Sequence, residues 1–223
     1  MSIIAINGSP RKNKNTATLL NKVLEGAASK GAETELFNLY DLNYKGCVSC
    51  FACKLKDGKS YGKCALRDDL TPILEKVEKA DAIVLGSPIY LASVTGEMRS
   101  FMERLLFPFS TYTPGYRSIF KRKISTAFIY TMNVTNEQME QLGYKQILKF
   151  SETYMERIFG YCESLIVNDT YQFEDYSKYV VTVFDEKKKA KVRSEDFPKE
   201  CEKAFNIGVR FANKLRVNTN GNC

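Results

Sequence analysis

The segment Ile6–Ala17, INGSPRKNKNTA, joins a short apolar run to a segment with helical periodicity. It offers hydroxyls, side-chain amides and positive charge but no carboxylate. Where a strand turns into a helix, unpaired backbone N–H groups and the positive end of the helix dipole together bind phosphate. The segment therefore predicts a phosphate-binding turn after the first strand of a sheet. The alternative is that Asn15 or Thr16 only caps the helix.

The glycine spacing of this turn limits the kind of phosphate ligand. Gly8 is its only glycine, so the turn matches neither the ATP-binding pattern G-x-x-x-x-G-K-[ST] nor the dinucleotide pattern G-x-G-x-x-G. Ser9 and Arg11 add a hydroxyl and a guanidinium, which suit a phosphate group. A monophosphate is therefore the ligand that this turn predicts.

Strands and helices alternate along the chain. The strands are expected at residues 3–6, 33–39, 82–85, 124–130 and 163–167. The helices are expected at residues 16–30, 96–106, 144–159 and 195–215, with a further short helix that is capped by Asp69 or Thr71 and has Pro72 in its first turn. Unbroken apolar strands in such an alternation are typical of a parallel sheet covered by helices on both faces. We therefore predict an α/β three-layer sandwich with a five-stranded parallel sheet, in a single domain spanning residues 1–223.

Three segments lie outside this alternation and are expected to be loops added to the domain. They are a cysteine-rich loop at residues 46–66 and two further loops at 107–123 and 171–193. Ligand sites in open parallel sheets lie beyond the carboxyl ends of the strands. The segments at those ends here, residues 8–16, 87–90 and 131–135, are rich in small or hydrogen-bonding side chains. We expect the binding site to form where they meet.

Composition narrows the class of protein. The 223 residues are 44% apolar and 26% charged with a net charge of +7, as in ordinary globular proteins. Because the chain has no histidine, catalytic triads and metal sites that use this residue are excluded. No apolar run approaches the roughly 20 residues that span a membrane, and the N-terminus lacks the features of a secretory signal. We therefore expect a cytoplasmic protein with no membrane partner.

Basic residues gather at 121–123 and 187–193. Such runs are usually solvated surface, and no motif that reads nucleic acid accompanies them. We therefore expect no nucleic-acid partner.

Two strings of the sequence resemble a known family. GSPRKNKNTATLL at residues 8–20 and GSPIYLASVTGEMRSFMER at 86–104 are similar to the flavodoxin-like NADPH-dependent FMN reductases. GCVSCFACKLKDGKSYGKCALRDDL at 46–70 narrows this resemblance to the iron–sulfur flavoprotein branch. The resemblance covers residues 1–135 and implies a flavodoxin-like fold that binds one FMN. It also implies that the flavin carries the chemistry, so no catalytic side chain is expected.

The resemblance also implies roles for particular residues. The phosphate would be bound by Ser9, Arg11, Asn15 and Thr16, with the adjoining Ala17 among the cofactor-binding residues. The isoalloxazine ring would be wrapped by Pro88, Ile89 and Tyr90, with the adjoining Leu91. The third loop would contribute Thr131, Met132 and Asn133. For Tyr90, the alternative is a tyrosine that only packs in the core.

Four cysteines form a second candidate site. Cys47, Cys50 and Cys53 follow a C-x2-C-x2-C pattern, and Cys64 comes after ten further residues, 54–63. Four thiolates from one loop suit an iron–sulfur cluster or tetrahedral zinc. The resemblance implies a 4Fe-4S cluster that exchanges single electrons with FMN. Because the gap before Cys64 is longer than in cluster-bearing members, free or disulfide-forming thiols stay open as an alternative, as does zinc.

Three other cysteines are scattered along the chain. Cys162, Cys201 and Cys223 are expected to be structural or incidental.

Our leading hypothesis is an FMN-binding oxidoreductase that takes electrons from NAD(P)H or a reduced carrier. The acceptor would be a small molecule or a protein, such as a flavin, a quinone or a redox protein, and the enzyme would be a homodimer or homotetramer. The main alternative is a non-enzymatic electron carrier of the flavodoxin or iron–sulfur flavoprotein type. A third hypothesis is a regulatory module with a zinc-stabilised loop. The net charge of +7 favours the enzyme, because flavodoxin carriers tend to be acidic.

Overall fold

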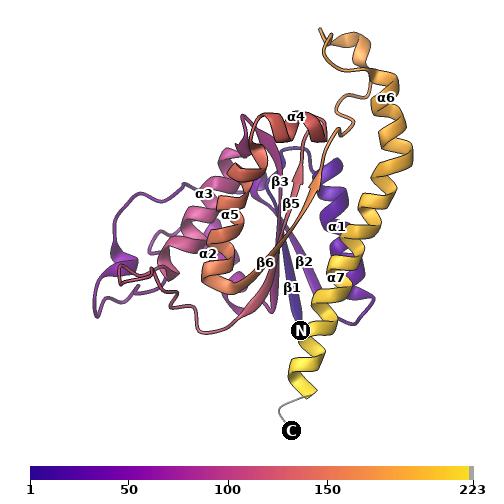
Figure 1. Cartoon of the computed structure of the whole chain (residues 1–223). Helices are drawn as coiled ribbons and strands as arrows, with labels where there is room; N and C mark the ends of the chain where they lie inside the picture. The colour runs from indigo at the N-terminus through magenta and orange to yellow at the C-terminus, as the bar shows by residue number, and fades with distance from the viewer. Residues whose placement is uncertain (221–223) are drawn as a thin grey trace.

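The computed structural model describes residues 1–220 of the chain and the side chains of residues 1–214, so Cys223 lies outside the described residues. A central sheet lies between two layers of helices (Figure 1). The strands are β1 (Ser2–Asn7), β2 (Glu33–Asn38), β3 (Ala82–Tyr90), β4 (Ser93–Val94), β5 (Ile124–Thr131) and β6 (Gly160–Val167). The helices are α1 (Asn15–Ala28), α2 (Leu70–Lys79), α3 (Gly96–Leu106), α4 (Asn136–Gln141), α5 (Tyr144–Phe159), α6 (Glu186–Lys191) and α7 (Phe197–Asn220).

The sheet has the flavodoxin-like order β2-β1-β3-β5-β6, and these strands are all parallel. The predicted α/β sandwich is therefore confirmed. The described residues contain six strands rather than five, because β3 runs on to Tyr90, turns at Leu91 and Ala92, and pairs antiparallel with the two-residue β4. Both turn residues adopt left-handed backbone conformations, with φ values of 48° and 65°.

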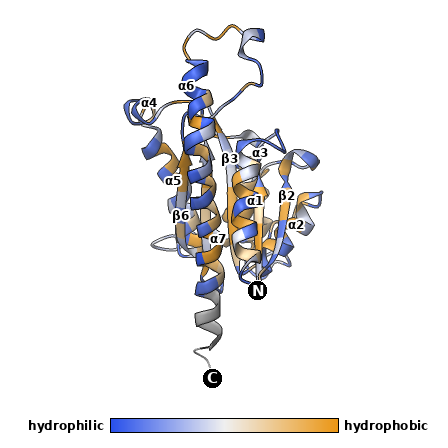
Figure 2. Cartoon of the chain, turned by 90° about the vertical axis from the view of Figure 1, so that its right-hand side faces the viewer, coloured by the Kyte–Doolittle hydropathy of each residue, from blue (hydrophilic) through white to orange (hydrophobic). Residues whose placement is uncertain are grey.

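The helices cover the sheet through two apolar cores. One core packs α2, α3 and α5 against the sheet, and the other packs α1 and α7 against its opposite face. All eight residues of β5 are buried, as expected for a strand covered on both sides. Figure 2 shows hydrophobic strands behind α1 and α7, whose outward faces are mostly hydrophilic.

The segment expected as a loop at 171–193 differs from that expectation. It contains a 3-10 turn (Tyr176–Lys178), the helix α6 and the start of a π-helical turn (Val192–Asp196) that leads into α7. The helix α6 has the sequence EKKKAK, which lacks the apolar periodicity that predicts a helix. Its N-cap is Asp185, whose side chain accepts hydrogen bonds from the backbone N–H groups of Lys187 and Lys188.

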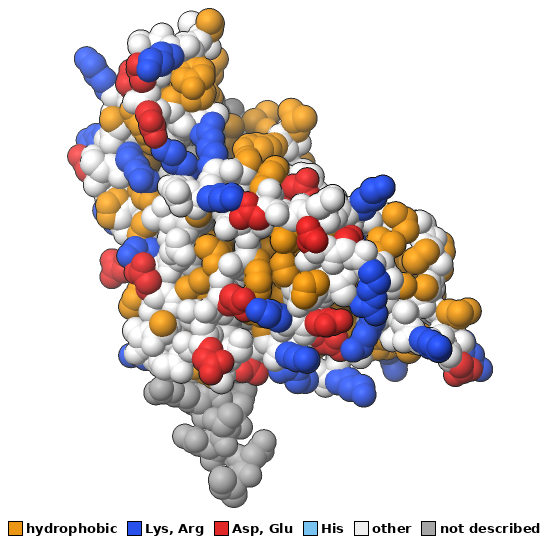
Figure 3. Space-filling model, turned by 180° about the vertical axis from the view of Figure 1, so that it is seen from behind, with side chains coloured by type: hydrophobic (Ala, Val, Ile, Leu, Met, Phe, Trp, Pro, Cys, Tyr) orange, Lys and Arg blue, Asp and Glu red, His pale blue; other side chains and the backbone are white. Residues whose placement is uncertain are grey.

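Charged side chains of both signs are mixed on the face seen in Figure 3. Figure 3 shows Lys and Arg interspersed with Asp and Glu on the back of the molecule. None of the helices within residues 1–220 combines the length and the hydropathy that crossing a membrane requires.

Two glycines set the distance between α1 and α7. A Cβ atom added to Gly26 would lie 2.0 Å from the carbonyl oxygen of Phe205, and one added to Gly208 would lie 1.9 Å from that of Val23. The two helix backbones therefore touch, and no side chain fits between them. This contact holds the C-terminal helix against the first helix of the fold.

Replacing Gly26 with Ala is expected to lower the free energy of unfolding by about 3 kcal/mol or more, because the new methyl group meets backbone that cannot move aside. Urea denaturation measures this change. The control is Gly96→Ala at the start of α3, where the added Cβ meets no described atom within 4 Å. Equal stability of the two variants would contradict the close helix contact.

Candidate functional site

The loops that follow β1, β3, β5 and β6 meet in one pocket at the carboxyl edge of the sheet. The pocket has a volume of about 600 Å³, including space open to solvent, which lies within the range of small-molecule sites. It is lined by Ser9, Arg11, Lys14, Asn15, Thr16, Pro88, Ile89, Tyr90, Thr131, Met132, Asn133, Thr170 and Gln172. β1 leads to a helix on one face and β3 to a helix on the other, so the pocket lies at the topological switch point.

The turn after β1 is held by backbone and side-chain hydrogen bonds. The N–H of Gly8 donates to the carbonyl of Gly86 at 2.8 Å, and the N–H of Ser9 donates to Asn7 Oδ1 at 3.0 Å. Ser9 Oγ in turn accepts a bond from the N–H of Arg11 at 3.1 Å. The turn therefore has a fixed shape without any ligand.

The N-terminus of α1 opens into this pocket without a cap. Lys14 occupies the N-cap position, and among the described residues no side chain accepts a hydrogen bond from the first turn, which also carries no acidic residue. The N–H groups of Asn15, Thr16 and Ala17 make no hydrogen bond within the described part of the chain. These free donors lie at the positive end of a helix dipole, which is the arrangement that binds an anion.

The loop after β5 presents an unsatisfied acceptor to the pocket. Asn133 Nδ2 donates to Gln172 Oε1 at 2.7 Å, whereas Asn133 Oδ1 is buried and finds no donor among the described residues. Thr131, the last residue of β5, is buried, and its hydroxyl lies 2.8 Å from the hydroxyl of Thr16. Since a buried acceptor is costly to leave unpaired, a donor from a bound ligand would satisfy it.

The loop after β3 forms the outer wall of the pocket. Tyr90 is 48% exposed, so it is not the packed core tyrosine of the alternative interpretation. Leu91 is fully exposed at the tip of the hairpin, and the side chain of Ala17 is buried in the core. All other residues predicted to bind the cofactor line the pocket.

Three lining residues were not predicted. Lys14 forms an ion pair with Glu174, and Thr170 and Gln172 come from the segment after β6. Lys14 lies within the predicted phosphate turn, so its positive charge was a usable signal. Thr170 and Gln172 reach the pocket only through the path of the chain, which no local pattern indicates.

The four clustered cysteines line a second, smaller pocket of about 320 Å³ with an apolar wall that includes Phe107. All four are free thiols, and burial raises the pKa of the Cys53 thiol. Within the described residues, no three His, Cys, Asp or Glu side chains are grouped so that they could hold a metal ion. Four thiols that line one apolar hollow are the kind of donor that an iron–sulfur cluster uses, but the structure does not gather them into a ligand group.

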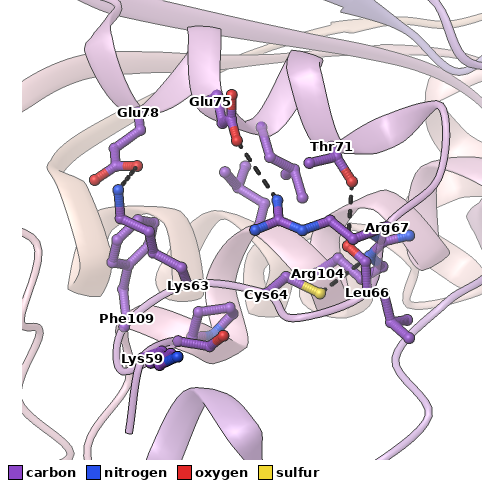
Figure 4. Close-up of a pocket in the computed structure, with 15 residues that line it drawn as sticks. Lys59, Lys63, Cys64, Leu66, Arg67, Thr71, Glu75, Glu78, Arg104 and Phe109 are labelled. Atoms are coloured by element: carbon purple, nitrogen blue, oxygen red, sulfur yellow. Dashed lines mark hydrogen bonds and ion pairs between the residues drawn. The ribbon is translucent and has the colours of Figure 1, made fainter.

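Arg104 of α3 holds the end of the cysteine loop (Figure 4). It is only 2% exposed, and its Nε donates to Cys64 Sγ at 3.3 Å. It also donates to the carbonyls of Lys45 and Leu66 and forms an ion pair with Asp68. Burial raises the pKa of Asp68, but the hydrogen bond and charge of Arg104 outweigh it and hold this pKa below its ordinary value.

The sequence matches one protein family and several curated relatives. Residues 1–152 match the family described as NADPH-dependent FMN reductase. An iron–sulfur flavoprotein of Methanocaldococcus jannaschii is 39% identical over 104 residues, which cover 47% of this chain and 51% of that protein. An iron–sulfur flavoprotein of Archaeoglobus fulgidus is 31% identical over 150 residues, which cover 67% of this chain and 63% of that protein. The chain therefore spans between about half and just under two thirds of the length of these relatives.

Solved structures share the fold at low sequence identity. An NAD(P)H:quinone oxidoreductase from Methanothermobacter marburgensis aligns with a TM-score of 0.66 at 14% identity, covering 94% of this chain and 96% of that one. An azoreductase from Bacillus anthracis str. Sterne aligns with a TM-score of 0.65 at 13% identity, covering 95% and 100%. At these identities, the alignments show the fold alone.

Replacing Asp68 with Asn is expected to lower the free energy of unfolding at pH 7 by about 3 kcal/mol, because the buried Arg104 loses its counter-charge. The folded-state pKa of Asp68 is lowered, so its stabilising effect is complete above the unfolded pKa of about 3.9 and is lost as the pH falls through the folded value. Urea unfolding measured from pH 7 down to the acid limit of the folded state gives the difference from wild type.

The matched control is Asp69→Asn, which removes the same charge from the exposed neighbouring residue. A difference between wild type and Asp68→Asn that persists undiminished below the folded pKa would contradict the ion pair as its cause.

Proposed function

The chain belongs to the NADPH-dependent FMN reductase family, and from this we propose that it is an FMN-dependent oxidoreductase. It takes electrons from NAD(P)H or a reduced carrier and passes them to a small acceptor such as free flavin, a quinone or a redox protein. The observation that carries this proposal is the uncapped N-terminus of α1, which opens into a pocket lined by loops from four strands.

The pocket fits FMN by its chemistry. The free N–H groups of the first turn of α1, the hydroxyl of Ser9 and the guanidinium of Arg11 would bind the phosphate. The loop after β3 would hold the ring, and Asn133 Oδ1, which finds no donor among the described residues, would accept a hydrogen bond from the ligand. When bound, FMN supplies hydride and single-electron chemistry, whereas the chain supplies position and polarity. A chain without histidine can perform this reaction because no general base is needed.

We assign the four clustered thiols to a 4Fe-4S cluster. The reasons are the shared apolar pocket and the name of the relatives, iron–sulfur flavoprotein. Cys47, Cys50, Cys53 and Cys64 would be its ligands, and Arg104 would hold Cys64 in place through its Nε–H. Such a cluster supplies single-electron chemistry. Zinc or a disulfide at the same cysteines are the other outcomes of the test below.

The proposal predicts that protein purified without oxygen binds FMN in a one-to-one ratio and that NAD(P)H reduces the bound flavin rapidly. Stopped-flow absorbance measures the reduction, and iron and sulfide analysis of the same sample tests the cluster. Protein that takes up no FMN would overturn the proposal. Slow reduction by NAD(P)H with fast reduction by a reduced protein carrier would instead indicate the non-enzymatic electron carrier.

Replacing Arg11 with Met is expected to weaken FMN binding by roughly tenfold to a hundredfold, because a charged hydrogen bond to the phosphate is lost. Riboflavin, which has no phosphate, should bind the variant nearly as well as wild type. Fluorescence titration with both flavins measures the effect.

The matched control for Arg11→Met is Lys12→Met. Lys12 carries the same charge in the same turn, but it pairs with Asp41 and is not a lining residue. An equal loss of FMN and riboflavin binding in Arg11→Met would show that Arg11 does not act on the phosphate.

A further inference from the structure

The segment that follows β6 closes one side of the pocket. We call residues 168–193 the strap. It lies outside residues 1–152, which match the family. In Figure 1 it continues from the end of β6 toward α6 and then enters the long helix α7. Its first part contributes Thr170 and Gln172 to the pocket wall.

The strap is bonded to the loop after β5. The N–H of Asp169 donates to the carbonyl of Val134 at 2.9 Å, and the N–H of Thr170 donates to the carbonyl of Met132 at 3.1 Å. Further along, Gln172 Oε1 accepts the bond from Asn133. The strap therefore follows the chain beyond the end of β5.

The strap is also bonded to the phosphate turn. Arg11 Nη1 donates to the carbonyl of Gln172 at 2.8 Å, and Asn15 Nδ2 donates to the carbonyl of Tyr171 at 3.0 Å. Arg193, at the far end of the strap, donates to Asn15 Oδ1 at 3.0 Å. Both the nitrogen and the oxygen of the Asn15 side-chain amide are therefore hydrogen-bonded to the strap. Gln172 links Arg11 on one side of the pocket with the β5 loop on the other.

One buried lysine fixes the strap in this position. Lys189 of α6 is only 2% exposed, and its Nζ donates to the carbonyl of Asn133 at 2.8 Å. It also forms an ion pair with Asp169 at the start of the strap and lies over the ring of Phe184 at 4.7 Å. A lysine is almost never buried unless it is paired. The contacts of Lys189 therefore hold α6 against Asp169 at the start of the strap and against Asn133 of the β5 loop.

We propose that Lys189 is a positioning residue for the phosphate-bearing cofactor. It fixes the strap, and the strap orients Arg11 and Asn15 at the N-terminus of α1 before the ligand arrives. Orienting long side chains in advance removes an entropic cost of binding. The strap bonds the side chains of Arg11 and Asn15 in the phosphate turn, and it also bonds Asn133 of the β5 loop. Since Arg11 is the strap-bound side chain assigned to the phosphate, the effect on FMN exceeds the effect on a flavin without phosphate. This inference deepens the proposed function and rests on it for the identity of the ligand.

The test compares flavin binding by Lys189→Met, by Asp169→Asn/Lys189→Met and by the control Lys187→Met. The double variant leaves no unpaired buried carboxylate, which keeps the experiment informative where Lys189→Met alone folds poorly. Lys187 is an exposed lysine of the same helix. Titration and dilution, followed by flavin fluorescence, give the dissociation constants and the release rates for FMN and riboflavin.

We expect FMN to bind about tenfold more weakly and to leave faster in the Lys189 variants, with a clearly smaller loss for riboflavin and little change in the Lys187 control. In an Arg11→Met background, Lys189→Met should then weaken FMN binding by no more than about twofold, because the strap acts through Arg11. A purely structural role of Lys189 would change FMN and riboflavin alike and would add to the effect of Arg11→Met.

Unchanged FMN binding in the folded double variant overturns this inference alone, since the wild type still binds the cofactor. Wild-type protein that takes up no FMN overturns the proposed function, and the role of Lys189 falls with it.

Discussion

The parallel pairing of β1 with β3 is the constraint on which the site depends. It places Gly8, which directly follows β1, beside Gly86 in the middle of β3, and the N–H of Gly8 donates to the carbonyl of Gly86. Thr95, the N-cap of α3, donates to the carbonyl of Gly8 at 2.7 Å. The turn after β1 is thereby locked to the start of α3. A side chain at either glycine would collide with its neighbours, because an added Cβ meets Met98 at 2.8 Å and Leu20 at 2.7 Å. The locked turn leaves the first N–H groups of α1 free for a ligand.

Local pattern was enough to predict most of the fold and much of the pocket. Hydrophobic periodicity predicted the helix at 144–159 with the bounds that the structure has. The predicted ends of the strands located the loops that line the pocket. Long-range placement could not be predicted. Gln172 reaches Arg11 only because the strap folds back over the pocket. Lys189 is buried although the basic sequence of its helix predicts a solvent-exposed segment. The turn at Leu91 was also hidden, because a left-handed conformation is rare for leucine and alanine.

Helix α3 connects the two candidate sites. Its first turn, capped by Thr95, is bonded to the phosphate turn, and its last turn carries Arg104 against the cysteine loop. Of the residues that the structure describes, none lines both pockets. The sites are therefore separate in space but share a rigid element. An α-helix rises about 1.5 Å per residue, so the eleven residues of α3 span roughly 16 Å between the two ends.

The contact between α1 and α7 means that the limits of sequence similarity are not the limits of a folding unit. Residues 1–152 match the family, but the apolar face of α1 is covered by Ile207 and Phe211 of α7, which come much later. The last strand of the sheet, β6, also lies beyond residue 152. A fragment cut at the end of the similar region would expose a face of the sheet and one side of its first helix to water. Excision of the shared portion would therefore yield an aggregating chain rather than a minimal flavodoxin-like domain.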